Sequence, residues 1–185
     1  MLHYIAFNKP YEVLSQFTDS ARRSTLKHFI DLPGIYPAGR LDYRSEGLLI
    51  LSNDGRFIKR MSDPRFERAK IYLAQVEGLP DPQDILRLQE SILLPGLQTR
   101  LVEAEIVPDP GLLPRSKPVR PYHPTTWIKL VLREGKKHEV RRLTAAIGYP
   151  TLRLVRIAVG PVRLEGLQPG AWRPLTDDEI SAVMH

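Results

Sequence analysis

Continuous and alternating runs of apolar residues predict several strands in this chain. Residues 47–51 form a continuous apolar run that leads into Asn53-Asp54-Gly55, which predicts a buried strand followed by a turn. Residues 127–133 alternate instead, and their apolar face is formed by Ile128, Leu130 and Leu132. The same reasoning predicts strands over residues 4–7, 13–17, 71–77, 152–159 and 161–164.

Apolar residues that recur every three or four positions predict helices between these strands. The clearest helix is predicted over residues 136–147, with an apolar face made by Val140, Leu143, Thr144 and Ile147. Shorter helices are predicted over residues 26–30 and 84–91, the latter with a stripe of Ile85, Leu88 and Ile92. Residues 108–124 contain six prolines, among them Pro121, and are predicted to form a loop.

The order of these elements indicates the fold class. Strands and short helices follow one another without regular strand–helix–strand alternation, which predicts an α+β fold. We expect a mixed, mostly antiparallel sheet with flanking helices. The length of 185 residues exceeds a typical domain of about 150 residues only slightly, so one domain is expected.

Composition excludes several classes of site. The chain has no cysteine, which rules out disulfide scaffolds, thiol nucleophiles and cysteine metal sites. Its five histidines show no metal-ligand spacing, and no phosphate-binding glycine motif is present. Apolar runs fall well short of the roughly 18 residues of a membrane span, and the first residues lack a signal-peptide pattern. We therefore expect a cytoplasmic protein.

Positive charge is concentrated in one part of the chain. Residues 115–163 hold 12 Lys or Arg against two acids, a net charge of +10, whereas the remainder holds 15 bases against 19 acids, a net charge of −4. A basic region of this kind favours a polyanionic partner. A solvated basic face without a partner is the alternative.

A polar loop ahead of the apolar run is the first candidate for chemistry. Residues 36–46 read Tyr-Pro-Ala-Gly-Arg-Leu-Asp-Tyr-Arg-Ser-Glu, and the strand that follows would hold these side chains rigidly. If the loop is extended, Arg40 and Asp42 point to the same side and present a carboxylate beside a cation. The alternative is an aspartate in a tight turn that pairs with Arg44.

A second polar stretch joins the strand ending at Arg133 to the clearest helix. Residues 133–142 read Arg-Glu-Gly-Lys-Lys-His-Glu-Val-Arg-Arg, which places His138 and Arg141 three residues apart on one flank of the helix. Phosphates are favoured near the beginning of a helix, where backbone N–H groups add to the cations. A solvated helix face is the alternative.

These residues resemble the pseudouridine synthases of the branch that modifies ribosomal RNA. The similar segments are Phe7-Asn8-Lys9-Pro10, Gly39-Arg40-Leu41-Asp42, residues 45–55, Lys70-Ile71-Tyr72 and residues 134–143. The resemblance implies one catalytic domain over residues 1–185, with two lobes around a central RNA-binding cleft. Many relatives carry a small N-terminal RNA-binding domain, which we do not expect here because the first similar segment begins at residue 7.

The resemblance also implies an activity and roles for individual residues. It implies isomerisation of a uridine in ribosomal RNA, most consistent with the large subunit, without cofactor or metal. Asp42 would be the catalytic carboxylate, Arg141 would pair with it, Tyr72 would stack on or hydrogen-bond the uracil, and Arg40 would fill the gap left by the flipped uridine. Seven further residues are expected to bind the RNA: Lys9, Lys70, Lys136, His138, Arg142, Arg153 and Arg156.

The expected partner is ribosomal RNA, either free or in ribosomal particles. The protein is expected to act as a monomer and not to associate with a membrane. A non-catalytic RNA-binding or ribosome-assembly protein would use the same basic region, together with Tyr122, Trp127 and Tyr149. A pure binder has no use for the carboxylate of Asp42 facing RNA, which favours the enzyme. A synthase that acts on transfer RNA stays open, and a hydrolase using Asp42 and Glu46 has the least support.

Overall fold

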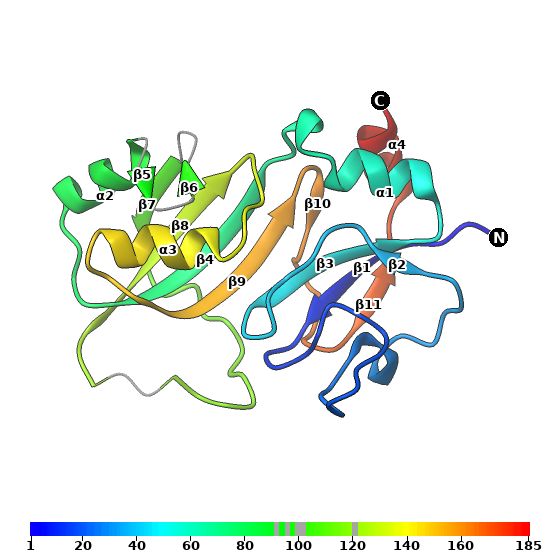
Figure 1. Ribbon diagram of the computed structural model, residues 1–185, viewed down its shortest axis with the longest axis horizontal. Helices are drawn as coiled ribbons and strands as arrows, with labels where there is room; N and C mark the ends of the chain where they lie inside the picture. The colour runs from blue at the N-terminus through cyan, green and yellow to red at the C-terminus, as the bar shows by residue number, and fades with distance from the viewer. Residues whose placement is uncertain (91–92, 95–96, 99–102, 120–121) are drawn as a thin grey trace. The chain divides into compact units, whose positions relative to one another are not determined.

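A computed structural model of the chain describes residues 1–90, 93–94, 97–98, 103–119 and 122–185. Two compact units are present (Figure 1). The first comprises residues 1–68 and 156–185, and the second comprises residues 69–155. Strand β9 (Thr151–Val159) begins in the second unit and ends in the first.

The sheet of the first unit is organised around β1 (Tyr4–Lys9). This strand lies between β3 (Glu46–Ser52) and β11 (Trp172–Pro174) and is antiparallel to both. β9 follows β3 in the sheet, while β2 (Tyr36–Pro37) pairs with β3 and β10 (Val162–Arg163) pairs with β9. β3 is buried along its whole length, as its apolar sequence predicts.

Two helices complete the first unit. Helix α1 (Gly55–Ser62) begins where the Asp54 carboxylate accepts two backbone N–H groups, and α4 (Asp177–Met184) begins at a capping box formed by Thr176 and Glu179. Both helices contribute to the core under the sheet, whose members include Leu48, Ile50, Phe57, Met61 and Val183. Short 3-10 helices span Leu26–His28 and Pro64–Phe66.

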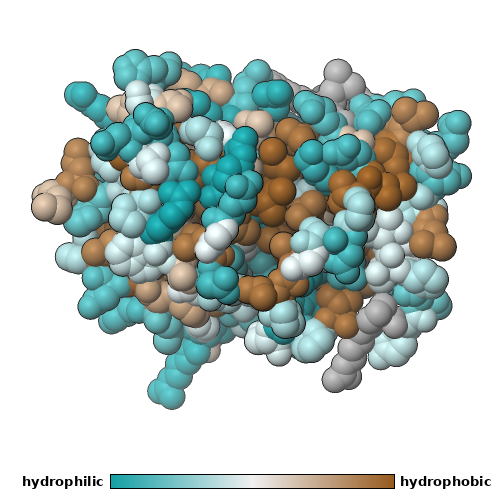
Figure 2. All heavy atoms as spheres, turned by 180° about the vertical axis from the view of Figure 1, so that it is seen from behind, coloured by the Kyte–Doolittle hydropathy of each residue, from teal (hydrophilic) through white to brown (hydrophobic). Residues whose placement is uncertain are grey.

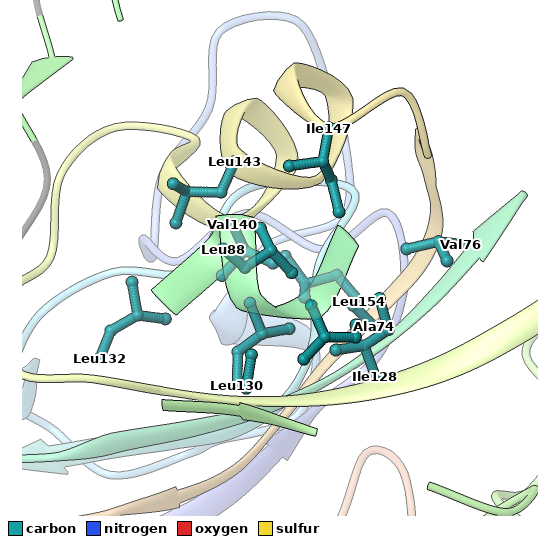
Figure 3. Packing of buried hydrophobic residues seen from close by; sticks show 12 residues of the cluster. Ala74, Val76, Leu88, Ile128, Leu130, Leu132, Val140, Leu143, Ile147 and Leu154 are labelled. Carbon is teal, nitrogen blue, oxygen red and sulfur yellow. The ribbon is translucent and has the colours of Figure 1, made fainter. Parts of the chain in front are cut away.

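The second unit contains β9, β4 (Lys70–Glu77), β8 (Thr125–Leu132) and β7 (Glu103–Val107) in that sheet order. β4–β8 and β7–β8 are antiparallel pairs, and β5 (Leu93–Leu94) pairs with β6 (Leu97–Gln98). Helices α2 (Pro82–Gln89) and α3 (Glu139–Ala146) pack on one face of this sheet. In Figure 3, Val140, Leu143 and Ile147 point from the α3 segment toward Leu130 and Ile128 of β8.

The predicted α+β fold with a mostly antiparallel sheet and flanking helices is confirmed. The strand predicted over residues 13–17 is wrong, because this segment makes only an isolated bridge from Leu14 to Thr25. The helix predicted over residues 26–30 is one short 3-10 turn, and the helix predicted from residue 136 begins at Glu139. Ser91, Ile92 and Pro121 lie outside the described residues, and the described part of residues 108–124 is a loop, as predicted.

The surface mixes hydrophilic and hydrophobic side chains. Figure 2 shows hydrophilic residues over much of one face, with hydrophobic residues in patches between them. Individually exposed apolar side chains include Leu79, Leu86, Leu113 and Tyr122, which is usual for folded proteins. Within the part of the chain that the structure describes, no helix is long and apolar enough to cross a membrane.

Candidate active site

The carboxylate of Asp42 lies half-buried in the loop that leads into β3. The loop follows Gly39, whose φ of 94° is accessible to glycine without strain, and it closes in a turn in which Ser45 N–H donates to Asp42 O at 3.0 Å. Ser45 and Glu46 are buried, whereas Arg40 is exposed. The loop therefore presents the Asp42 side chain from a backbone that the buried strand anchors.

Backbone contacts fix the loop on both sides of Asp42. On one side, Ser15 Oγ donates to Leu41 O at 2.8 Å and accepts the N–H of Leu41 at 3.1 Å. On the other side, the N–H of Glu12 donates to Tyr43 O at 2.9 Å. The segment of residues 12–15 thus holds the two neighbours of Asp42 in place. Sequence reasoning missed Ser15 and Glu12 in this role, since nothing in their spacing links them to residues 41–43.

Lys9 supports this arrangement from inside the first unit. Its side chain is fully buried, and its Nζ donates to Pro10 O at 2.9 Å and to Val13 O at 2.7 Å. Burial lowers the pKa of Lys9 to about 7, and the negative charges of Glu46 and Asp42 oppose that shift. Lys9 therefore ties the residues 10–13 to the end of β1, close to the charge of Asp42.

Replacing Lys9 by Met is expected to destabilise the first unit. Two buried carbonyls would lose their donor while the nearby carboxylates would lose a cation, so the free energy of unfolding should fall by about 2–4 kcal/mol. The pKa of Lys9 is lower in the folded chain than in the unfolded chain, so the unfolded chain binds more protons between pH 7 and 10. The free energy of unfolding of the wild type therefore rises with pH in this range. The deficit of Lys9→Met should consequently be larger at pH 9 than at pH 7.

Urea denaturation at both pH values tests this prediction. Lys27→Met is a matched control, because Lys27 is exposed and its replacement should change stability by no more than about 0.5 kcal/mol. A Lys9→Met variant as stable as this control would contradict the structural role of the ammonium group.

Arg156 is the other predicted RNA contact that the structure places in the interior. It is only 4% exposed, and its Nε donates to Leu48 O at 2.8 Å. Lys9 and Arg156 thus contact the protein's own carbonyls, so a supporting role fits them better than direct contact with a phosphate. The remaining predicted RNA contacts are exposed or half-buried: Arg40, Lys70, Lys136, His138, Arg142 and Arg153.

Tyr72 and Arg141 belong to the second unit. Tyr72 lies on β4 opposite Leu130 of β8 and packs against the hydrophobic cluster under α3. Arg141 lies in α3, and its Nη1 donates to Thr151 O at 3.0 Å, at the beginning of β9. This bond restrains the guanidinium group of Arg141.

A pair of carboxyl groups flanks the beginning of α3. Glu139, the first residue of the helix, is 5% exposed, and its Oε2 accepts the N–H of Lys136 at 3.0 Å. Burial, together with a hydrogen bond to the Glu134 carboxyl, raises the pKa of Glu139 to about 7. Glu134 also forms an ion pair with Lys136 at 2.7 Å. Sequence reasoning made no prediction of a role for these two glutamates.

Replacing Glu139 by Gln is expected to stabilise the protein at pH 8 but not at pH 4. The raised pKa means that the unfolded chain releases this proton near pH 4.5 while the folded chain keeps it, so wild-type stability falls between pH 4.5 and 7. Gln mimics the protonated acid, and the expected gain at pH 8 is about 1–2 kcal/mol after allowance for solvent screening.

Chemical denaturation at the two pH values measures that gain. Glu103→Gln serves as the control, because the Glu103 carboxylate is 72% exposed in a 3.7 Å pair with Arg133. An equal gain at both pH values, or in both variants, would contradict the assignment of a raised pKa to Glu139.

Metal-binding residues do not gather anywhere in the described ranges. Within them, no group of three or more His, Asp or Glu side chains could hold a metal ion. The expectation that the chain uses neither cofactor nor metal stays a prediction.

Both the sequence and the structure of the chain are similar to those of known proteins. Residues 3–146 match the model of a family described as RNA pseudouridylate synthase. Ribosomal large subunit pseudouridine synthase E from Vibrio vulnificus is 45% identical over 174 residues, which cover 93% of this chain and 74% of that protein. The protein of the same name from Xanthomonas axonopodis pv. citri is 45% identical over 170 residues, which cover 89% and 90%.

Similarity extends to a solved structure. A crystal structure of a pseudouridylate synthase matches with a TM-score of 0.84 and 30% sequence identity, over 99% of this chain and 74% of that one. The family match spans Lys9, the Asp42 loop, Tyr72 and Arg141.

Proposed function

Because this chain belongs to the family of RNA pseudouridylate synthases, we propose that it isomerises a uridine of large-subunit ribosomal RNA to pseudouridine. The observation that carries the proposal is the Asp42 loop, in which a half-buried carboxylate is held between two hydrogen-bonded neighbours within the matched region. The large-subunit substrate is supported by the relatives named synthase E at 43–45% identity.

The reaction exchanges one glycosidic bond for another. The bond from ribose C1′ to uracil N1 breaks, the base turns, and a bond from C1′ to C5 forms, while the C5 proton is lost and N1 gains one. We propose that Asp42 acts at the ribose, either as a nucleophile at C1′ or as a base. Both roles need an ionised carboxylate in a fixed position, and the hydrogen bonds to Leu41 and Tyr43 supply that position.

The other roles are proposals of the same kind. Arg141 would pair with the Asp42 carboxylate, and its bond to Thr151 O would limit how its guanidinium moves. Tyr72 would contact the uracil ring, and exposed Arg40 would occupy the place of the flipped uridine. Lys9 and Arg156 would act indirectly, by supporting β1, β3 and the segment that holds the Asp42 loop.

The basic side chains that are not buried would bind the RNA. Lys70, Lys136, His138, Arg142 and Arg153 are at least partly exposed in the basic region or next to it, and we propose that they contact phosphates or ribose. We further propose that the chain acts as a monomer in the cytoplasm, with ribosomal RNA as its partner.

The decisive experiment maps pseudouridines in ribosomal and transfer RNA from cells that have or lack the gene. We expect one large-subunit position to lose pseudouridine without the gene, and to regain it on expression of wild type but not of Asp42→Asn. Loss of pseudouridine at a transfer RNA position would support the alternative that the chain is a synthase acting on transfer RNA. An unchanged map would support a binding protein without catalysis.

A further inference from the structure

A cavity of about 280 Å³ lies in the second unit and includes neither Tyr72 nor Arg141. Its floor is formed by Gln75 of β4, Trp127 of β8 and Arg153 of β9. Gln75 and Trp127 are direct partners in the β4–β8 register. Their neighbours Ala74, Val76 and Ile128 belong to the hydrophobic cluster under α2 and α3. Because side chains alternate along a strand, the cavity opens on the sheet face opposite these helices.

The proline-rich loop between β7 and β8 forms the rim of the cavity. Asp109, Pro114, Arg115 and Pro118 line it from this side. Arg115 donates from Nε to Lys117 O at 2.5 Å and from Nη1 to Leu152 O at 3.5 Å, and Arg153 donates from Nη2 to Leu113 O at 2.8 Å. The contacts of Arg115 with Leu152 O and of Arg153 with Leu113 O therefore link the loop to β9.

The lining combines positive charge with an aromatic ring and an amide. Arg115 and Arg153 line the cavity together with one acidic residue, Asp109, whose Oδ1 accepts the N–H of Gly111 at 2.9 Å. Each guanidinium has five N–H donors, and phosphate oxygens are suitable acceptors for them. Trp127 is only 8% exposed, and the part of its indole that lines the cavity is the aromatic surface that a base could contact. The Gln75 amide, which donates to Thr125 Oγ1 at 3.0 Å, has a further N–H and a carbonyl oxygen.

We propose that this cavity binds one nucleotide of the substrate RNA other than the uridine that is isomerised. Its phosphate would lie against Arg115 and Arg153, and its base would lie against Trp127 and Gln75. The volume of 280 Å³ is just below the lower end of small-molecule sites, at about 300 Å³, so it suits one nucleotide and no larger ligand. The proposal rests on the chain acting on RNA, and it assigns the cavity a part in choosing or holding the substrate.

Tryptophan fluorescence tests the proposal directly. The chain has two tryptophans, and Trp172 belongs to the first unit, so Trp172→Phe leaves Trp127 as the sole indole reporter. Titration with pentauridylate should quench this fluorescence to saturation, because a base stacked on the indole provides a quenching path. Arg153→Gln in this background should weaken binding at least about fivefold and flatten the plot of log affinity against log salt by about 0.7.

Two further variants separate binding from a loosened loop. Arg87→Gln is the matched control, since Arg87 lies on α2 with a side chain 58% exposed, and its affinity should stay within about twofold of the parent. Gln75→Leu keeps both guanidinium groups and replaces the amide that would contact the base with an apolar side chain of similar size, so it too should weaken binding and the quench. If Arg153→Gln shifts the Trp127 emission before RNA is added, that substitution has altered the cavity itself. The Gln75→Leu variant then tests whether the cavity binds the nucleotide.

Several outcomes would overturn the proposal. These are the absence of a saturable quench, an Arg153→Gln variant that binds like Arg87→Gln, an equal response to uridine without phosphate, and an equal response to a pentaglutamate peptide. The quench does not depend on turnover. Its failure would therefore leave the proposed isomerisation intact, while a failure of pseudouridine formation would leave the quench measurable.

Discussion

Asp42→Asn is expected to abolish pseudouridine formation while RNA binding persists. The substitution keeps the shape of the side chain and removes the anion, so both proposed roles of the carboxylate are lost, with a fall in single-turnover rate of about 1,000-fold or more. Binding should be unchanged or tighter, because one negative charge facing a polyanion has been removed. The hydrogen bonds from the Ser15 hydroxyl and the Glu12 N–H to the neighbours of Asp42 do not involve the Asp42 side chain, so the loop should keep its conformation.

Single-turnover assays on a large-subunit RNA fragment, with binding measured in parallel, check this expectation. Asp31→Asn is a suitable control, since Asp31 is an exposed residue of the same unit and its replacement should leave both quantities unchanged. Near-normal turnover by Asp42→Asn would refute the assignment of Asp42 and favour a protein that only binds RNA.

Elements with strong periodicity could be predicted from the sequence. The apolar run at residues 47–51 predicts a buried strand, and the structure buries all of β3 because both of its faces are covered. The spacing of Val140, Leu143 and Ile147 likewise predicts the helix that packs on β8. Helices α1 and α4 were missed, although Asp54 and the Thr176–Glu179 pair are recognisable capping signals.

Irregular backbone explains where sequence reasoning failed near the site. Residues 13–17 look like a strand because Val13 and Leu14 are apolar, yet their hydrogen bonds go to Ser24 and Leu41 rather than to a ladder. Lys9 is among the RNA contacts predicted with the resemblance, whereas the turn after β1 presents two carbonyls to which its buried ammonium group donates. The usual exposure of lysines gives no indication of this burial. Such contacts depend on long-range packing, which no local pattern encodes.

Residues brought together by distant segments were the hardest to predict. Trp127, Gln75 and Arg153 come from three strands, and only their shared sheet face together with the loop of residues 109–119 makes a cavity. The resemblance to a family supplied Asp42, Tyr72 and Arg141 as a set, and their roles stay predictions. The sequence alone indicated where polar loops adjoin strands, but not which side chains lie close together.

Arg141→Met is expected to lower the single-turnover rate by about 100-fold or more, with little change in RNA affinity. Met keeps much of the volume of the side chain and removes the guanidinium group, so an Asp42 carboxylate that relies on this partner would lose its orientation. The bond from Arg141 Nη1 to Thr151 O would also be lost, and denaturation must show that the fold survives. Arg87→Met is the matched control on α2, where rate and stability should be unaffected.

The pH dependence of Arg141→Met separates two physical explanations of that loss. An aspartate carboxyl in water titrates near pH 3.9, so at pH 7 it is ionised without help from an arginine. If Arg141 acts by orienting the carboxylate, the rate of Arg141→Met should stay low from pH 6 to pH 9. A rate that recovers as the pH rises would mean that the arginine is needed for ionisation, and a rate like that of Arg87→Met would exclude Arg141 from the reaction.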